Sequence, residues 1–168
     1  MTAEELRATQ APIKDRFRAD AASAVATLCA RGVLDVERLQ CVVESATGTP
    51  IVAGVHPLAG GDGAGACAGD ILLQALVACA GVTLCAVATA MNLGMTAGKL
   101  AAEGDLDFRG TLGVSRDAPV GFTAIRLVAG IDATADDAAL EKLAELTERY
   151  CVVAQSLKPA VSVTVQRR

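Results

Sequence analysis

The chain has 168 residues, of which 52% are apolar and 20% charged, and its formal net charge is -4. This length suits one domain of ordinary size, and the composition is that of a globular rather than a disordered protein. The excess of acidic groups argues against nucleic acid and against an anionic membrane surface as partners, because both attract basic surfaces. Three Phe, one Tyr and no Trp leave the core to be filled by Ala, Val, Leu and Ile.

The first 37 residues are polar and predict a helical arm, while residues 38–168 form the main domain. A second helical piece is expected from Ala21 to Arg31, with Gly32 ending it. The arm is either a solvated surface helix or part of a dimer interface. Because the first residues lack the apolar segment of a secretory signal, a cytoplasmic location is the default expectation.

Two short strands, 38–44 and 49–55, predict a hairpin, and a glycine-rich loop follows at 56–69. Gly63, Gly65 and Ala68 match the letters of a dinucleotide-binding fingerprint. The match lacks an adjoining strand and an acidic residue about 20 positions later, so no nucleotide cofactor is expected. The loop is better suited to shaping the rim of a pocket.

A long apolar helix is expected from Asp70 to Gly94, because no charged residue occurs between Asp70 and Lys99. Asp70 can cap its start and Gly94 can end it. The segment has no polar face, so we expect it to be buried on most of its circumference. It is also long enough to cross a bilayer, but it has no Trp or Tyr belt, and we expect no membrane span.

Cys79 lies near the middle of this segment between Ala78 and Ala80, with Gly81 following. Neighbours this small do not cover the thiol, and a glycine inside a helix is unfavourable by about 1 kcal/mol relative to alanine. Close approach of another backbone or of a substrate explains such a glycine. Two interpretations stay open: Cys79 is a reactive thiol, or it is a small hydrophobic residue of the core.

The six cysteines, at positions 29, 41, 67, 79, 85 and 151, show no Cys-x-x-Cys spacing, and His56 is the one histidine. This pattern predicts no zinc or other metal site, and in a cytoplasmic protein it predicts mostly free thiols. Cys85 is expected in the core, and Cys67 is a candidate for an additional resolving thiol. His56 is expected to be a structural hydrogen-bonding residue.

The second half of the chain predicts two paired strands, 95–110 and 122–132, then helical segments and a final strand at 160–165. Thr134–Asp137 resembles a capping box, and Leu140, Leu143 and Cys151 fall on one face of the helix that follows. A further helical piece is expected from Val152 to Lys158. The element order indicates an α+β fold with a largely antiparallel sheet packed around the central helix.

Two cysteine-containing segments carry a resemblance to a known family. Cys79 in Leu-Val-Ala-Cys-Ala-Gly-Val-Thr-Leu, with Cys151 in Arg-Tyr-Cys-Val-Val-Ala-Gln-Ser-Leu, resembles the OsmC/Ohr family of hydroperoxide-reducing proteins over about residues 38–165. The resemblance implies an intertwined homodimer whose sheets wrap around two central helices. It also implies that Cys79 attacks a peroxide and Cys151 resolves the sulfenic acid into a disulfide, which a thiol or lipoyl reductant restores.

Such chemistry requires a cation near the thiol, because a Cys of pKa about 8.5 is mostly protonated at neutral pH. Cys79 lies more than two turns into its helix, too far for the helix dipole to act. Arg38 is the first candidate for the activating arginine, and Arg16 or Arg18 would serve if the arm crosses to a partner subunit.

Three positions depart from the family pattern. The usual Glu ten residues before the reactive Cys is Gly69 here, and the Pro after the second Cys is Val152. Asp70, nine residues before Cys79, matches other OsmC-like members. Nine residues turn a helix by about 180 degrees, so Asp70 has either a catalytic or a capping role.

The function predicted from the sequence is that of a thiol-dependent peroxidase for organic hydroperoxides, an antioxidant role in oxidative stress. An alternative is a non-catalytic OsmC-like dimer that binds a small apolar ligand in the same cavity, with the cysteines as packing residues. A third hypothesis, a membrane-associated or purely structural protein, comes from the uncharged run alone.

Overall fold

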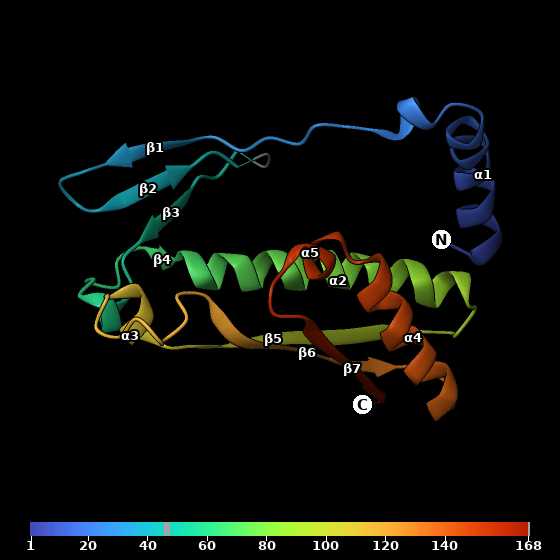
Figure 1. Ribbon diagram of the computed structural model, residues 1–168. Helices are drawn as coiled ribbons and strands as arrows, with labels where there is room; N and C mark the ends of the chain where they lie inside the picture. The colour runs from blue at the N-terminus through green and yellow to red at the C-terminus, as the bar shows by residue number, and fades with distance from the viewer. Residues whose placement is uncertain (46–47, 168) are drawn as a thin grey trace. The chain divides into compact units, whose positions relative to one another are not determined.

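A computed structural model describes residues 1–45 and 48–167 (Figure 1). It is a mixed α+β structure, which confirms the predicted class. The helices are α1 (Ala3–Ala19), η1 (Ala21–Ala24), η2 (Pro57–Ala59), α2 (Ala68–Ala90), α3 (Phe108–Thr111), α4 (Asp137–Tyr150) and α5 (Val152–Ser156). The strands are β1 (Gly32–Asp35), β2 (Gln40–Val43), β3 (Ile51–Gly54), β4 (Ala66–Cys67), β5 (Ala97–Leu106), β6 (Phe122–Asp132) and β7 (Val161–Arg167).

The chain divides into two compact units. Unit 1 comprises Met1–Thr27, Leu76–Glu103 and Ile125–Arg168, and unit 2 comprises Leu28–Ala75 and Gly104–Ala124. The elements α2, β5 and β6 each contribute residues to both units. The separation of an arm at 1–37 from a domain at 38–168 stays a prediction.

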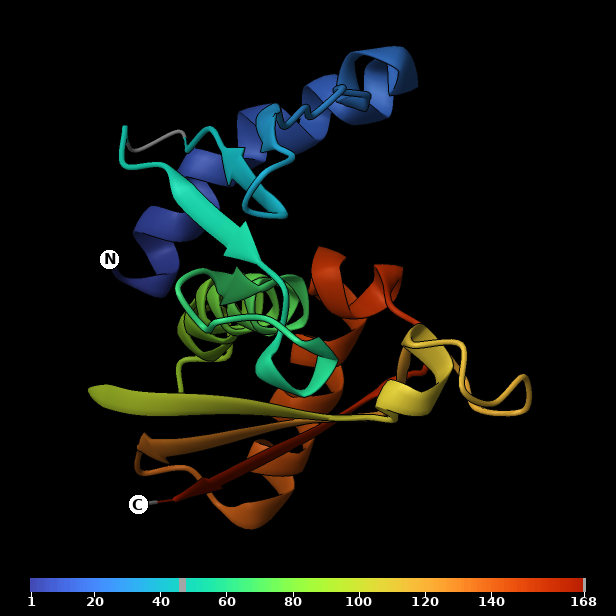
Figure 2. The same ribbon diagram turned by 90° about the vertical axis from the view of Figure 1, so that its left-hand side faces the viewer.

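Unit 1 is built on a three-stranded sheet in the order β5-β6-β7, with β6 and β7 parallel. Figure 2 views α2 end on, with the strands of this sheet beside it. Alternate residues of β6, from Ile125 to Ile131, are buried as their period-2 pattern predicts. Of these, Ala129 and Ile131 pack with Leu84 of α2 and Leu143 of α4 into one hydrophobic core.

The helix α4 presents the apolar face that its spacing predicts. Leu140, Leu143 and Thr147 are buried, although the Thr147 hydroxyl has no hydrogen-bond partner within the described residues. The helix begins later than expected. Asp136 is the N-cap, and its side chain accepts a hydrogen bond from the Ala139 amide at 2.8 Å. Asp136 displaces the expected capping box because its carboxylate reaches the N3 amide directly.

The central helix α2 is confirmed as one long element, but both ends differ from the prediction. It begins at Ala68, so Asp70 lies in the first turn, where its charge favours the helix dipole, rather than at the cap. Asn92, not Gly94, ends it: Asn92 has φ 56°, and the Leu93 amide donates to the Ala88 carbonyl at 3.1 Å. This hydrogen-bond pattern is a Schellman motif with Asn at the left-handed position.

In the single chain α2 is buried along one stripe only. Leu76, Ala80, Leu84 and Ala88, four residues apart, are buried, whereas Val82 is 74% exposed. The expectation of burial on most of the circumference is therefore wrong for one chain, because the sheet and α4 contact one side of the helix. By length and composition alone α2 is one helix that could cross a membrane, with 22% of its most apolar window buried.

The N-terminal region is helical over a shorter span than predicted. Thr2 caps α1 with a reciprocal capping box to Glu5, but helix after η1 is absent from residues 25–31. The predicted helix to Arg31 is wrong. Val25 and Thr27 are β-branched and disfavour helix, and the following Gly32–Asp35 segment pairs antiparallel with β2 instead.

Unit 2 contains a four-stranded sheet in the order β1-β2-β3-β4. The predicted hairpin is confirmed as the antiparallel pair β2 and β3, and its connection includes residues 46–47, which lie outside the described chain. The sequence did not predict β1, nor β4, which pairs parallel with β3 inside the glycine-rich loop. The chain thus has two small sheets in place of the single one expected.

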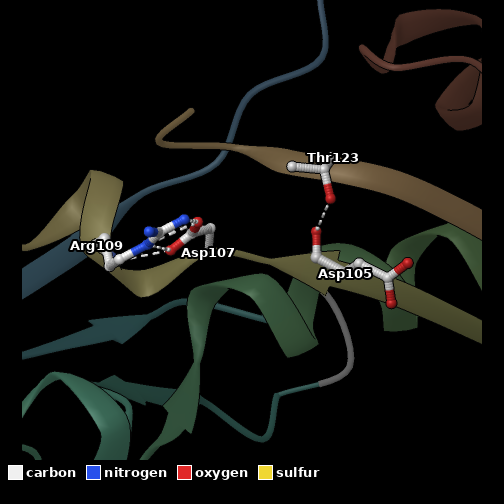
Figure 3. Close-up of polar contacts among 4 residues, drawn as sticks. All are labelled: Asp105, Asp107, Arg109 and Thr123. Atoms are coloured by element: carbon white, nitrogen blue, oxygen red, sulfur yellow. Dashed lines mark hydrogen bonds and ion pairs between the residues drawn. The ribbon is translucent and has the colours of Figure 1, made fainter. Parts of the chain in front are cut away.

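Polar contacts fix the link between β5 and β6 in unit 2 (Figure 3). The Thr123 hydroxyl donates to the Asp105 carbonyl at 3.1 Å. Asp107 caps α3 and accepts from the Arg109 guanidinium, whose Nε and Nη2 lie 3.0 and 2.5 Å from its two oxygens. Hydrogen bonds from Arg109 hold the pKa of Asp107 below its usual value.

The ring of Phe122 occupies space that two glycines leave free. A Cβ at Gly69 would lie 3.2 Å from the ring, and one at Gly104 would lie 2.6 Å from it. Real Cβ atoms do not approach this closely, so Gly104 is required by the position of the ring.

We expect Gly104→Ala to lower the free energy of unfolding by about 1–3 kcal/mol, because the new methyl group overlaps the Phe122 ring. Phe122→Leu should lessen that effect in a double-mutant cycle measured by urea denaturation. Gly113→Ala is a control without neighbours, since a Cβ there meets nothing within 4 Å and its cost comes from φ 69° alone. Additive effects of the substitutions at 104 and 122 would contradict this interpretation.

A candidate dithiol site

Cys79 and Cys151 come from different helical elements of unit 1. Cys79 lies midway along α2 beside the buried stripe and is partly buried. Cys151 is the single residue between α4 and α5, with φ -77° and ψ 108°, and it is completely buried. The extended conformation of Cys151 ends one helix and starts the next, so its side chain acts as the N-cap of α5.

The two sulfur atoms share the first turn of α5. The Ala154 amide donates to Cys151 Sγ at 3.5 Å. The amides of Val153 and Val152 donate to the sulfur of Cys79, and the Cys151 thiol also donates to it. Amides at the start of a helix have no partner within that helix, so they are available to a negatively charged sulfur. The structure therefore brings together the two cysteines singled out in the sequence.

This arrangement lowers the pKa of Cys79. Partial burial acts in the opposite direction, but hydrogen bonds from the Val153 amide, from the Cys151 thiol and from the Val152 amide outweigh it. The groups that mainly lower this pKa within the described part of one chain are thus two amides and a thiol. The amides belong to the neighbouring helix α5. The sequence did not predict that amides of another helix stabilise the Cys79 thiolate.

The pKa of Cys151 is raised, first by burial and then by its hydrogen bond to Cys79 and the negative charge that Cys79 carries. The pair therefore divides its roles. Cys79 is the thiol that loses its proton more readily, and Cys151 is the thiol that keeps its proton and donates to it. Two thiols that interact in this way are placed to form and break a disulfide.

The candidate arginines lie elsewhere in the chain. Arg38 lies in the turn between β1 and β2 in unit 2, not in a strand, and its guanidinium pairs with Asp35 at 3.3 Å. In α1, Arg18 pairs with Asp15 at 2.6 Å and Arg16 lies over the Phe17 ring. The activating role predicted for an arginine stays a prediction.

Asp70 is exposed in the first turn of α2. On an ideal helix it lies about 13.5 Å along the axis from Cys79 and on the opposite side. At the preceding position, a Cβ in place of the Gly69 hydrogen would lie 3.2 Å from the Phe122 ring, which leaves little room for a side chain. A catalytic role for Asp70 stays a prediction, and its observed position suits the helix dipole.

The remaining cysteines are free thiols in the structure, and Cys85 is exposed rather than in the core as expected. Cys85 is exposed because no other element of the described chain packs against that side of α2. A Cβ at Gly81 would meet only a Leu100 methyl group, at 3.8 Å, so no backbone among the residues that the structure describes explains that glycine. His56 caps η2, where its Nδ1 accepts from the Leu58 amide at 3.0 Å. No cluster of three or more potential metal ligands is found among residues 1–45 and 48–167.

The fold is α+β, and it brings two cysteine thiols together at the start of α5. Comparison with family models matches residues 61–166, more than half of the chain, to the OsmC-like protein family. The chain belongs to the OsmC-like family. No curated protein matches its sequence significantly.

Solved structures share this fold at low sequence identity. An OsmC-like protein of unknown function from Vibrio cholerae is 15% identical with a TM-score of 0.68, covering 84% of this chain and 99% of that one. An organic hydroperoxide resistance protein from Elizabethkingia anophelis is 16% identical with a TM-score of 0.66, covering 86% and 98%. The organic hydroperoxide resistance protein OhrB of Bacillus subtilis is 18% identical with a TM-score of 0.60, covering 85% and 100%.

We expect alkylation of Cys79 by iodoacetamide to show a pH midpoint below that of an ordinary thiol. Cys151→Val should raise this midpoint, because the thiol donor is lost, whereas Cys151→Ser retains a donor and should raise it less. Peptide mass spectrometry separates Cys79 from the exposed Cys29, which serves as an internal reference.

The same shift predicts a pH dependence of stability. Because the pKa of Cys79 is lowered on folding, the contribution of Cys79 to the free energy of unfolding is present above the pKa of the unfolded thiol and is lost as pH falls through the folded value.

In the alkylation experiment, an unchanged midpoint in Cys151→Val would show that the Cys151 thiol does not stabilise the Cys79 thiolate.

Proposed function

We propose that this protein is a thiol-dependent peroxidase that reduces organic hydroperoxides, with Cys79 as the attacking thiolate and Cys151 as the resolving thiol. The observation that carries the proposal is the placement of both thiols at the first turn of α5, close enough for each to shift the pKa of the other, in opposite directions. Membership of the OsmC-like family and the fold shared with organic hydroperoxide resistance proteins support a peroxidase-type redox role.

The proposed reaction has two steps. The Cys79 thiolate attacks the terminal peroxide oxygen, the O–O bond breaks, and the alkoxide takes a proton from water to leave as an alcohol. Cys79 is then a sulfenic acid. The Cys151 sulfur attacks it, an S–S bond forms, the S–O bond breaks, and water leaves. Two electrons from two thiols have passed to the peroxide.

The α5 amides have a defined part in this sequence. Before the reaction, the Val152 and Val153 amides stabilise the negative charge on Cys79. Cys151 stays protonated beside it until Cys79 loses that charge on oxidation, after which the pKa of Cys151 is no longer raised by a neighbouring thiolate. A dithiol reductant such as a lipoyl group then restores both thiols by exchange, as expected in the cytoplasm, where thiols are kept reduced.

The test is a thiol count on the reduced protein treated with tert-butyl hydroperoxide. We expect two thiols to be lost per chain, and none from this pair in Cys79→Ser. Cys151→Ser should lose one thiol and give a dimedone-reactive sulfenic acid at Cys79. Cys85→Ser, on the same helix, is the matched control and should behave as the unchanged protein.

A different result would favour the alternative of a non-catalytic protein that binds a small apolar ligand. The structure contains one observation for it: Cys151 has a structural role as the N-cap of α5. If the loss of two thiols persists in Cys79→Ser, or if no thiol is lost from the unchanged protein, the peroxidase proposal fails.

We also propose that the protein acts as a homodimer. In one chain α2 leaves a stripe of small residues exposed, namely Ala75, Ala78, Val82 and Cys85, whose three- and four-residue spacing lies on one helix face. In unit 2, the large apolar side chains Val33, Leu34, Val36 and Leu39 are also exposed. A second copy would cover this apolar surface, and small residues allow two helices to approach closely.

We expect the unchanged protein to sediment at twice its 17.0 kDa chain mass. Ala78→Lys should shift it toward monomer, because a charge on the exposed stripe opposes burial of that face. Ala138→Lys is the matched control, since it places the same charge on an exposed position of α4. A monomeric unchanged protein, or equal effects of the two substitutions, would contradict the dimer.

A further inference from the structure

The hydroxyl of Thr147, on α4, is buried without a hydrogen-bond partner. Among the residues that the structure describes, it is the one buried side-chain polar atom in this state. The whole residue is shielded from solvent. A hydroxyl that leaves water without gaining a new partner is destabilising, and buried polar groups are for this reason nearly always bonded. Thr147 therefore lowers the stability of the folded chain, which indicates a role other than packing.

Hydroxyls on two other helices of the chain are bonded to their own backbone. Thr83 of α2 donates to the Cys79 carbonyl at 2.8 Å, and Ser156 of α5 donates to the Val152 carbonyl at 2.7 Å. The carbonyl four residues earlier is the usual partner of a hydroxyl within a helix. Thr147 makes no such bond to its helix, so its hydroxyl is free to take another partner.

Cys151 lies one helical turn after Thr147, on the same face. The Cys151 amide donates to the Thr147 carbonyl at 3.0 Å, so the turn that joins the two residues is intact. Side chains four residues apart on a helix have their Cβ atoms about 5–6 Å apart. Both side chains are completely buried. A hydroxyl and a sulfur on neighbouring Cβ atoms come within hydrogen-bond distance when the hydroxyl turns toward the sulfur.

In the reduced protein the Cys151 sulfur makes little demand on such a donor. The thiol keeps its proton and donates to Cys79, and the Ala154 amide donates to its sulfur at 3.5 Å. A neutral thiol is only a weak acceptor, so the Thr147 hydroxyl gains little by turning toward it. The demand changes in the second step of the proposed reaction, because Cys151 must then carry a negative charge in a buried place.

We propose that the Thr147 hydroxyl donates a hydrogen bond to the Cys151 sulfur as that sulfur ionises, and thereby speeds the resolving step. This role rests on the proposed function. The Cys151 thiolate attacks the Cys79 sulfenic acid, the S–S bond forms and the S–O bond breaks. The hydroxide leaves as water with the proton that Cys151 lost, while Thr147 keeps its own proton. A bond that is absent at rest and made in the transition state is the kind that raises a rate.

The test follows the Cys79 sulfenic acid by timed dimedone trapping after one addition of tert-butyl hydroperoxide. Thr147→Val keeps the shape of the side chain and should slow the disappearance of the sulfenic acid roughly ten- to a hundred-fold, as for a lost hydrogen bond to a charged group. Formation of the sulfenic acid should be unchanged. Thr147→Ser retains a hydroxyl and should restore most of the rate.

The stability of the reduced protein distinguishes this role from a structural one. Removal of an unpaired buried hydroxyl should leave the urea midpoint of Thr147→Val unchanged or raised. Thr83→Val is the matched control, because it removes a hydroxyl that is bonded within a helix, and it should lower the midpoint. A lowered midpoint in Thr147→Val would assign the hydroxyl to structure and overturn the proposal, as would an unchanged rate of resolution.

A second measurement does not depend on peroxide. Cys79 is the charged neighbour that raises the pKa of Cys151 within the described chain, and Cys79→Ser removes it. In that background the ultraviolet absorbance of the Cys151 thiolate should appear at higher pH when Thr147→Val is added, and Cys79→Ser with Cys151→Ser supplies the baseline. An unchanged titration would contradict the hydrogen bond.

The two measurements also separate the role of Thr147 from the proposed function. If Thr147→Val raises the titration midpoint of Cys151 while peroxide consumes no thiols from the unchanged protein, the hydrogen bond stands and the peroxidase falls. If peroxide consumes both thiols and Thr147→Val resolves the sulfenic acid at the unchanged rate, the peroxidase stands and the role of Thr147 falls.

Discussion

The interruption between α4 and α5 is the constraint on which the dithiol site depends. Cys151 takes an extended conformation there, so the chain ends one helix and immediately begins another. The new helix exposes its first amides, and two sulfur atoms accept hydrogen bonds from them. A continuous helix through this point would direct those amides to carbonyls one turn earlier, and Cys79 would lose its strongest donors.

The composition of α2 follows from its two tasks in the chain. Its buried stripe, from Leu76 to Ala88, holds the helix against the sheet of unit 1. Its other faces carry small residues, so a neighbouring helix can approach the Cys79 sulfur. Large side chains on those faces would keep the first turn of α5 away from that sulfur.

The sequence was most informative where a periodic pattern was long. The bounds of β6, the buried face of α4 and the existence of α2 follow from apolar spacing, because burial of one face selects such spacing. The helix expected over Ala21–Arg31 was wrong, because local composition does not reveal that the segment after it pairs with β2. The helix start expected at Thr134 was also wrong, because the Asp136 carboxylate accepts from the Ala139 amide and caps the helix there. Cys79 and Cys151 were identified from small neighbours and family resemblance. The amides that stabilise the Cys79 thiolate were not identified, because every residue type except proline has a backbone amide. A cysteine directly before the helical piece predicted from Val152 was the one feature of the sequence that could have indicated them.

The packing of Phe122 against Gly69 and Gly104 has a consequence for how this chain can change over time. A Cβ at position 69 would lie 3.2 Å from the Phe122 ring, and the ring itself stands against Gly104 on another strand, so it has little room to shift. A larger side chain at position 69 is therefore accommodated more easily together with a smaller residue at position 122. The two positions are expected to change as a pair.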